Sequence, residues 1–337
     1  MEEKYFSIKF LNGKLIFLDQ TKLPLEEVYV ETDDYERIAI AIERLEMRGA
    51  PLIGVAACYG LALSLKNSIR ESSDENFYKA YNRLARTRPT AVNLFTALKE
   101  MKNVFEQNKD SENIYNIVLS KAIDFHQDDI KKCKMMGENG LNIFKKKSTV
   151  LTHCNTGKLA TAGDGTAFSV IKCGYEKGLV EYVYADETRP LLQGLRLTSY
   201  ELERSGIPFS VQTDSSAAVL MQKGKIDLVI TGADRIALNG DSANKIGTYN
   251  LAVLCNFHNI PFYIAAPTTT IDRNIASGEE IEIEFRHQEE LLSINGYRIA
   301  PDNYKAFTPA FDVTPSHLIS GIITEEGIFN FPYNFLK

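Results

Sequence analysis

From residue 148 onward the sequence repeats one rhythm: a short apolar run, a polar loop, and a segment with helical spacing. The apolar runs are Thr149–Thr152, Tyr182–Tyr184, Phe209–Gln212, Leu228–Ile230 and Phe262–Ala265. Short runs separated by helical segments are typical of βαβ units, whose strands lie parallel because each connection crosses back over the sheet. The pattern therefore predicts a Rossmann-like parallel-sheet domain over residues 146–337.

Residues 1–145 follow a different pattern. Apolar residues flank the turn dipeptide Asn12-Gly13, which favours a hairpin within Ile8–Leu18. Helical spacing then takes over, in residues 38–45, in residues 74–105 with a break at Arg88-Pro89, and in residues 114–125. The predicted fold class is therefore α/β, with a small N-terminal strand-plus-helical-bundle domain, residues 1–145, followed by the Rossmann-like domain.

A polar cluster follows each predicted strand. The clusters are His153–Gly157, Asp186–Pro190 with Gln193-Gly194 close behind, Thr213–Ser216, Gly232–Arg235 and Pro267–Thr270. Parallel strands bring their carboxyl ends to one edge of a sheet, where open α/β sheets bind their ligands. We therefore expect a ligand site at this edge.

Two features of the stretch 228–250 indicate acid chemistry beside an anion. Asp234 follows an apolar strand, where burial would raise the pKa of its carboxyl and favour a proton-carrying form. Asn244-Lys245 is expected to head a helix whose free backbone N–H groups bind an anion. A phosphorylated small molecule fits this combination.

Two arginines of the N-terminal part are candidate phosphate ligands. Arg48 precedes Gly49-Ala50 on a glycine-containing turn before a helix, and Arg88 precedes another helix start. The guanidinium fork matches phosphate geometry, although a surface salt bridge is the alternative role for either arginine.

Composition excludes several classes of protein. A formal net charge of -6 and a pI near 5.6 argue against nucleic-acid binding. No apolar run is long enough for a membrane span, and the N-terminus lacks the pattern of a signal peptide. The 5 cysteines are scattered without a Cys-x-x-Cys pair, which favours a reduced, cytoplasmic protein with no zinc site.

Several blocks of the sequence resemble the methylthioribose-1-phosphate isomerase family. They are Arg48-Gly49-Ala50-Pro51, Arg88-Pro89-Thr90, residues 152–157, 187–194, 232–236 and 243–249, and the C-terminal residues 309–325. These motifs are long, and they occur in order along nearly the whole chain. The resemblance implies a fold shared with ribose-1,5-bisphosphate isomerases and with regulatory subunits of a translation-initiation exchange factor, and it implies a homodimer.

The resemblance also implies an activity, the conversion of 5-methylthioribose 1-phosphate to 5-methylthioribulose 1-phosphate in methionine salvage. Asp234 matches the family's acid, and Cys154 matches the cysteine that supports the transition state. The residues that match the family's substrate contacts are Arg48, Gly49, Ala50, Arg88, Gln193, Asn244 and Lys245. No redox cofactor is needed, because the hydrogen moves within one molecule, and the resemblance implies no cofactor. We expect no metal either.

Two departures from the family pattern leave the 5-substituent of the sugar open. The family commonly has a methionine near Ser216 and a glutamate at the position of Phe285. A 5-deoxyribose 1-phosphate isomerase with the same catalytic pair is therefore one alternative. A regulatory subunit that binds sugar phosphates without turnover is another, which the presence of Cys154 and Asp234 disfavours.

Overall fold

The computed structural model describes residues 5–68, 70–88, 92–294 and 296–335. The chain forms two compact units. The first unit contains Met1–Met135 and Thr156–Phe168, and the second contains Met136–Asn155 and Ser169–Lys337. The chain thus passes between units after residues 135, 155 and 168, a more interleaved division than the single boundary predicted after residue 145.

The first unit opens with a three-stranded antiparallel sheet of β1 (Ile8–Leu11), β2 (Lys14–Leu18) and β3 (Tyr29–Thr32). The predicted hairpin is confirmed, since β1 pairs with β2 across a turn in which Asn12 and Gly13 have φ of 52° and 72°. Positive φ at both turn residues gives the twist that two-residue hairpins require. The third strand was not predicted.

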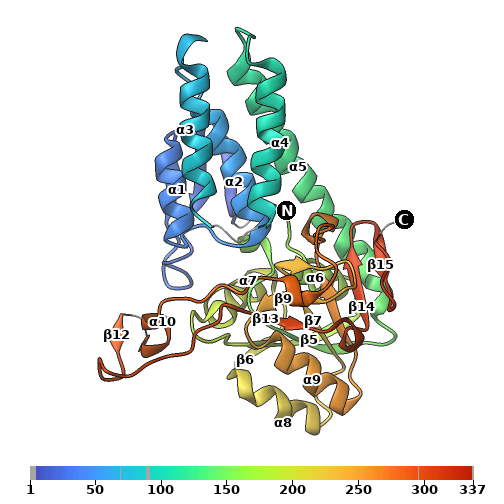
Figure 1. The fold of residues 1–337 in the computed structure, drawn as a ribbon. Helices are drawn as coiled ribbons and strands as arrows, with labels where there is room; N and C mark the ends of the chain where they lie inside the picture. Colours follow the sequence, from blue (N-terminus) through green and yellow to red (C-terminus); the bar gives the residue numbers. More distant parts are fainter. Residues whose placement is uncertain (1–4, 69, 89–91, 295, 336–337) are drawn as a thin grey trace. The chain divides into compact units, whose positions relative to one another are not determined.

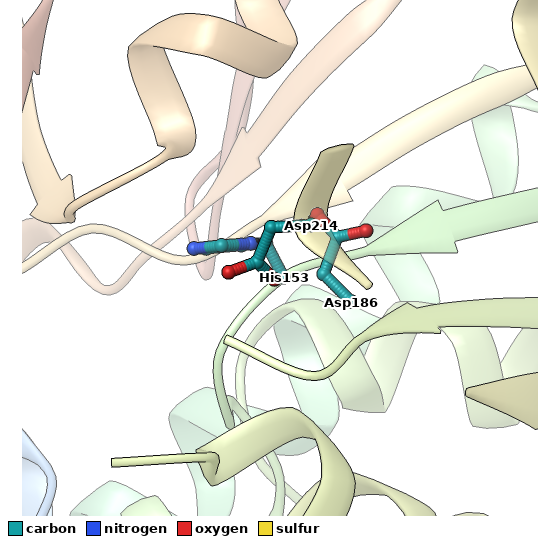
Figure 2. A group of neighbouring side chains, drawn as sticks. All are labelled: His153, Asp186 and Asp214. Atoms are coloured by element: carbon teal, nitrogen blue, oxygen red, sulfur yellow. Dashed lines mark hydrogen bonds and ion pairs between the residues drawn. The ribbon is translucent and has the colours of Figure 1, made fainter. Parts of the chain in front are cut away.

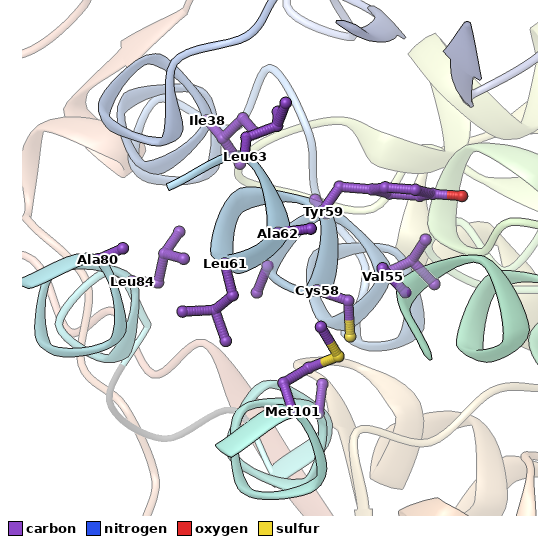
Figure 3. Packing of buried hydrophobic residues seen from close by; sticks show 14 of the residues in the cluster. Ile38, Val55, Cys58, Tyr59, Leu61, Ala62, Leu63, Ala80, Leu84 and Met101 are labelled. Carbon is purple, nitrogen blue, oxygen red and sulfur yellow. The ribbon is translucent and has the colours of Figure 1, made fainter. Parts of the chain in front are cut away.

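Helices make up most of the rest of the first unit. They are α1 (Tyr35–Glu43), α2 (Ala50–Leu63), α3 (Ser73–Ala85), α4 (Val92–Asn108) and α5 (Ile114–Gly140), whose last residues belong to the second unit. α2 buries nearly all of its residues, as a helix that is apolar on every side should. Figure 3 shows Val55, Cys58 and Tyr59 of α2 in this core, with residues of α1, α3 and α4 around them.

The second unit is built on a seven-stranded sheet with the order β15-β14-β10-β7-β4-β5-β6. Its strands are β4 (Ser148–Thr152), β5 (Val180–Asp186), β6 (Phe209–Gln212), β7 (Leu228–Thr231), β10 (Phe262–Ala265), β14 (Gly321–Thr324) and β15 (Gly327–Phe329). All the predicted strands are present and parallel, and only β15 runs antiparallel. The chain runs outward from β4 to β6 and then resumes with β7 on the other side of β4, as in doubly wound sheets.

The helices of the second unit are short, with 4 to 11 residues each. They are α6 (Ala167–Glu176), which begins in the first unit, α7 (Ser199–Ser205), α8 (Ala217–Gln222), α9 (Thr248–His258) and α10 (Glu289–Leu292). α8 and α9 lie side by side against the sheet (Figure 1), and the apolar residues between them and the strands form the second core. No helix in the described ranges is long and apolar enough to cross a membrane.

Two small sheets complete the second unit. β11 (Ser293–Ile294) pairs with β12 (Tyr297–Arg298), and β8 (Arg235–Ile236), β9 (Ser242–Lys245) and β13 (Phe311–Thr314) form an antiparallel sheet. The prediction that Asn244-Lys245 heads a helix is wrong, because both residues end β9 and α9 begins only at Thr248. Pairing with β13, which is distant in sequence, extends this segment.

Candidate active site

Cys154 and Asp234 follow neighbouring strands at the point where the strand order reverses. β4 and β7 pair in parallel, with Val150 opposite Leu228, and the Thr152 hydroxyl donates to the Ile230 carbonyl at 2.9 Å. Open α/β sheets bind ligands in the crevice outside the carboxyl ends of such a strand pair. The sheet thus brings together the segments that carry the two predicted catalytic residues.

The backbone of Cys154 has an unusual, well-supported conformation. Its φ is 61°, in the left-handed region, and the side chain is buried. The Cys154 N–H donates to the Thr188 hydroxyl at 2.9 Å, and the Thr198 hydroxyl donates to the Cys154 carbonyl at 2.6 Å. Left-handed backbone at a residue other than glycine costs free energy, and functional sites are where such strain gathers.

The loop after β5 supplies this support. Thr188 is itself left-handed, with φ of 65°, and its hydroxyl donates to the Asp186 carbonyl at 3.0 Å. Asp214, just after β6, accepts the Thr188 N–H at 2.7 Å and the Arg189 N–H at 2.8 Å on its two carboxylate oxygens. Carboxylates that accept backbone N–H groups form strong, charge-assisted bonds. Asp214 therefore fixes the start of this loop.

Gln193 lies at the end of the same loop. It directly precedes a π-helical turn, Gly194–Thr198, and its side chain is buried with Oε1 lacking a hydrogen-bond partner among the described residues. A β-carbon on Gly194 would come within 1.6 Å of the Asp186 carbonyl oxygen, so only glycine fits there. The loop thus packs directly on the end of β5, and a buried amide oxygen stays available to a ligand.

His153 and Asp186 form a fully buried pair (Figure 2). Nδ1 of His153 lies 2.9 Å from Oδ2 of Asp186, and Nε2 lies 2.9 Å from the Ile246 carbonyl oxygen. Burial disfavours the imidazolium, but the hydrogen bond and charge of Asp186 outweigh it, so the pKa of His153 is raised. Because both ring nitrogens face protein acceptors, His153 braces the site and has no ring nitrogen left for a substrate.

His153, Asp186 and Asp214 also hold three possible metal-ligand atoms within 4.8 Å of one another. The atoms that could bind an ion already make hydrogen bonds within the protein. Asp186 accepts from His153 and from Gln212 Nε2 at 2.8 Å, and Asp214 accepts two backbone N–H groups. These side chains hold the loops together by hydrogen bonds, and an ion at this position would have to break those hydrogen bonds.

Asp234 lies between β7 and β8 and is half-buried. Its N–H donates to the Ala243 carbonyl at 2.9 Å, so its backbone adjoins β9, which ends with Asn244 and Lys245. Asn244 is buried and donates to the Thr248 hydroxyl at 3.0 Å, and Lys245 Nζ donates to the Ala310 carbonyl at 2.9 Å. The structure thus places the backbone of Asp234 beside the strand that carries Asn244 and Lys245.

The start of α9 does not bind an anion in the way expected from the sequence. The two carboxylate oxygens of Asp312, on β13, accept the Gly247 N–H at 2.7 Å and the Tyr249 N–H at 3.0 Å. A carboxylate of the protein therefore already satisfies this helix N-terminus. Cys154 does not lie at the N-terminus of an α-helix either, because α6 begins only at Ala167.

The remaining predicted site residues belong to the first unit. Gly49 caps α2 and Ala50 begins it, directly after Arg48. Gly49 has φ of 98°, and a β-carbon there would lie 2.5 Å from the Ala160 Cα and carbonyl oxygen, so the turn touches the segment Thr156–Phe168. Arg88 lies just before α4, and the next residues of its motif, 89–91, fall outside the described ranges.

The supporting roles of four residues were not predicted from the sequence: Thr188, Thr198, Asp214 and Asp312. The polar clusters after β5 and β6 contained Thr188 and Asp214, yet nothing in their spacing shows that one carboxylate clamps the other loop. Asp312 contacts α9 through the pairing of β13 with β9. No local signal in the sequence predicts that pairing.

Comparison with known proteins places these features in a family context. Residues 46–331 match the model of the initiation factor 2 subunit family. A methylthioribose-1-phosphate isomerase of Caldicellulosiruptor saccharolyticus is 51% identical over 328 residues, 96% of each chain.

Two solved structures are similar over nearly their full length. The 5-methylthioribose 1-phosphate isomerase from Pyrococcus horikoshii has a TM-score of 0.92 at 40% identity and covers 99% of this chain and 97% of its own. A structure from A. fulgidus described as translation initiation factor eIF-2B, subunit delta, has a TM-score of 0.88 at 40% identity, with 98% and 97% covered.

Proposed function

The chain belongs to the methylthioribose-1-phosphate isomerases of the initiation factor 2 subunit family, and we infer that it converts 5-methylthioribose 1-phosphate to 5-methylthioribulose 1-phosphate. It is an aldose–ketose isomerase that acts on a sugar 1-phosphate. The observation that carries this inference is the presence of Cys154 and Asp234 on the segments that follow β4 and β7, the neighbouring strands at which the strand order of the sheet reverses.

The reaction needs proton transfer without an ordinary ring opening. The anomeric oxygen carries the phosphate, so the sugar cannot open to a free aldehyde. The enzyme must instead assist departure of the ring oxygen and then move hydrogen from C2 to C1. Asp234 is the group we propose for the proton transfer, and Cys154 supports the charge that develops in the transition state.

The remaining assigned residues hold the substrate. In the second unit, the Gln193 amide, the Asn244 amide and the Lys245 ammonium serve the phosphate and hydroxyls. In the first unit, we assign Arg48, Gly49, Ala50 and Arg88 to phosphate binding because they match the family motifs. We further propose that the enzyme is a cytoplasmic homodimer.

Two alternatives have specific support. Ser216 and Phe285 depart from the family pattern, which favours considering 5-deoxyribose 1-phosphate as the substrate. The relative from A. fulgidus described as an initiation-factor subunit is 40% identical, which favours considering a regulatory sugar-phosphate-binding role. The presence of both Cys154 and Asp234 argues for turnover.

Ketose 1-phosphate formation from three purified substrates tests the assignment. The substrates are 5-methylthioribose 1-phosphate, 5-deoxyribose 1-phosphate and ribose 1,5-bisphosphate. We expect the methylthio sugar to give the highest kcat/KM. Preference for the deoxy sugar would change the substrate assignment, and no turnover of any of the three would refute the isomerase. The mass of the protein in solution, from light scattering, tests the dimer.

A further inference from the structure

We propose that Thr188 and Asp214 are positioning residues for Cys154: together they fix the backbone from which its thiol reaches the substrate. The proposal rests on the catalytic role proposed above for Cys154. Neither residue needs to touch the reacting atoms. Asp214 acts on Thr188, and Thr188 acts on Cys154.

The backbone conformation of Cys154 needs support from neighbouring residues. Its φ of 61° is a conformation that residues other than glycine adopt only when their surroundings hold them there. The direction of the Cα–Cβ bond depends on this backbone, so releasing it would redirect the thiol. The N–H that the left-handed turn presents is held by the Thr188 hydroxyl at 2.9 Å.

Thr188 also depends on other residues for its backbone conformation and for the orientation of its hydroxyl. Thr188 is β-branched and fully buried, and its own φ is 65°, which is rarer for a branched side chain than for any other. Its hydroxyl is oriented because it also donates to the Asp186 carbonyl at 3.0 Å. With that proton committed, the hydroxyl oxygen presents its lone pairs to the Cys154 N–H.

Asp214 is the anchor, the residue that holds the Thr188 backbone in place. Asp214 accepts the consecutive N–H groups of Thr188 and Arg189 at 2.7 and 2.8 Å, one on each carboxylate oxygen. This two-point contact fixes both the position and the rotation of the Thr188 peptide. Figure 2 shows Asp214 beside Asp186, the residue whose carbonyl orients the Thr188 hydroxyl. Hydrogen bonds thus connect Asp214 to Thr188 and Thr188 to Cys154, which links the end of β6 to Cys154.

Thr188→Val and Thr188→Ser test the path. Valine keeps the volume and branching but removes the hydroxyl, whereas serine keeps the hydroxyl. Because displacing a reacting group by about 1 Å can cost ~100-fold in rate, we expect kcat of Thr188→Val to fall ~100-fold with KM within ~3-fold. Thr188→Ser should stay within ~3-fold of wild type. Equal losses in both variants would overturn the proposal.

The matched control is Thr314→Val. Thr314 is fully buried on β13, and its hydroxyl has no hydrogen-bond partner among the described residues. This variant makes the same chemical change in the same unit, on a strand that carries none of the proposed catalytic or substrate-binding residues. We expect wild-type kcat from it. A loss of kcat as large as that of Thr188→Val would overturn the proposal.

Alkylation of Cys154 by iodoacetamide, followed by peptide mass spectrometry, gives a readout that needs no substrate. Cys154 is only 7% exposed, so releasing its backbone should raise its alkylation rate. We expect at least a ~5-fold rise in Thr188→Val and the wild-type rate in Thr188→Ser. If the wild type turns over no sugar phosphate while this pattern holds, the proposed function fails and the positioning role stands. Unchanged alkylation in Thr188→Val refutes the positioning role.

Asp214→Asn tests the anchor, and it also serves if Thr188→Val does not fold. An asparagine side chain keeps one acceptor oxygen and loses the other, so kcat should fall ~10-fold or more with KM nearly unchanged. Because both residues act through one path, the double variant should lose no more than the worse single variant. Multiplied effects would show two independent roles and contradict the proposal.

Discussion

At the scale of single residues, Asp234 and Cys154 have different tasks, yet the loss of either side chain should slow the reaction by a similar factor. Asp234→Asn removes the transferable proton while keeping the shape, and we expect kcat to fall ~100-fold or more. Cys154→Ala should lose a similar factor, because it removes a group that supports charge in the transition state. Initial rates with the preferred sugar 1-phosphate measure both. A near-normal rate in Asp234→Asn would remove it as the acid.

Deuterated water separates two routes for the hydrogen. A proton that passes through an enediolate can exchange with solvent and bring label into the product. A direct hydride shift from C2 to C1 cannot. Mass spectrometry of the product formed by the wild type distinguishes the two routes.

The buried pair of His153 and Asp186 makes a prediction about pH. The pKa of His153 is raised above its unfolded value near 6.5, so its contribution to stability is complete below that pH and is lost as the pH rises through the raised pKa. Breaking a buried pair costs about 3–5 kcal/mol. Asp186→Asn should therefore cost about that much at pH 6 and less at pH 9, in urea unfolding at the two values. An equal cost at both would contradict an imidazolium at His153.

At the scale of elements, the strands of the main sheet were predictable because each is a short apolar run bounded by polar residues. β10 illustrates this, since its residues Phe262–Ala265 coincide with the predicted run. β9 was not predictable, because Ser242–Lys245 contains polar residues that resemble a helix start. What makes it a strand is the ladder to β13, and such long-range pairing leaves no local pattern.

The same limit applies to the site. The clusters after the strands predicted that the segments with Cys154 and Asp234 leave the same edge of the sheet, because parallel topology alone brings strand ends together, and β4 and β7 do pair in parallel. The contacts that orient Cys154 depend on hydroxyl and carboxylate geometry between three loops. That geometry follows from packing and from backbone conformations that no spacing rule encodes.

Gly49 offers a prediction about the start of α2. Alanine there would need a φ of 98° and would place its Cβ 2.5 Å from backbone atoms of Ala160. We expect Gly49→Ala to lower the free energy of unfolding by about 2–5 kcal/mol. The control is Gly206→Ala, where φ is 68° and nothing lies within 4 Å, with a cost of about 1 kcal/mol. Equal costs in chemical denaturation would show that contact with Ala160 is unimportant.

At the scale of the whole molecule, the segment Thr156–Phe168 returns to the first unit and is held there by several polar contacts. Gln20 Nε2 donates to the Leu159 carbonyl at 2.7 Å, and the Ser7 hydroxyl donates to the Thr161 carbonyl at 2.9 Å. Asp129, buried on α5, accepts the Ala162 N–H at 2.7 Å. These contacts make the segment part of the first unit's interior.

Asp129 therefore predicts a pH dependence. Burial raises the pKa of Asp129 to about 6 from its ordinary value of 3.8, so between those two pH values the folded state binds a proton that the unfolded state has lost. Stability falls as the pH rises from about 4 to 6, by up to about 3 kcal/mol. Asparagine keeps an acceptor for the Ala162 N–H without the charge, so the stability of Asp129→Asn relative to wild type should rise over this interval.

The control for Asp129→Asn is Asp128→Asn on the exposed side of α5. Asp128 pairs with Lys132 at 2.6 Å, and its side chain is 54% exposed, so removing its charge should change little. Unfolding free energies of wild type and both variants at pH 4, 5, 6 and 7 provide the comparison. A flat difference for Asp129→Asn would show that this carboxyl is solvated in the folded protein.

The repeated passage of the chain between units also bears on how such proteins can be inherited and engineered. A recombination event joins one N-terminal piece to one C-terminal piece at a single crossover. Here any crossover between residues 136 and 168 would combine parts of one unit's interior from two different parents. Such chimaeras would fold only if the buried contacts of the two parents match. We therefore expect the two units to be inherited together. Grafting either unit onto another scaffold would require cuts in the gene at all three boundaries, after residues 135, 155 and 168.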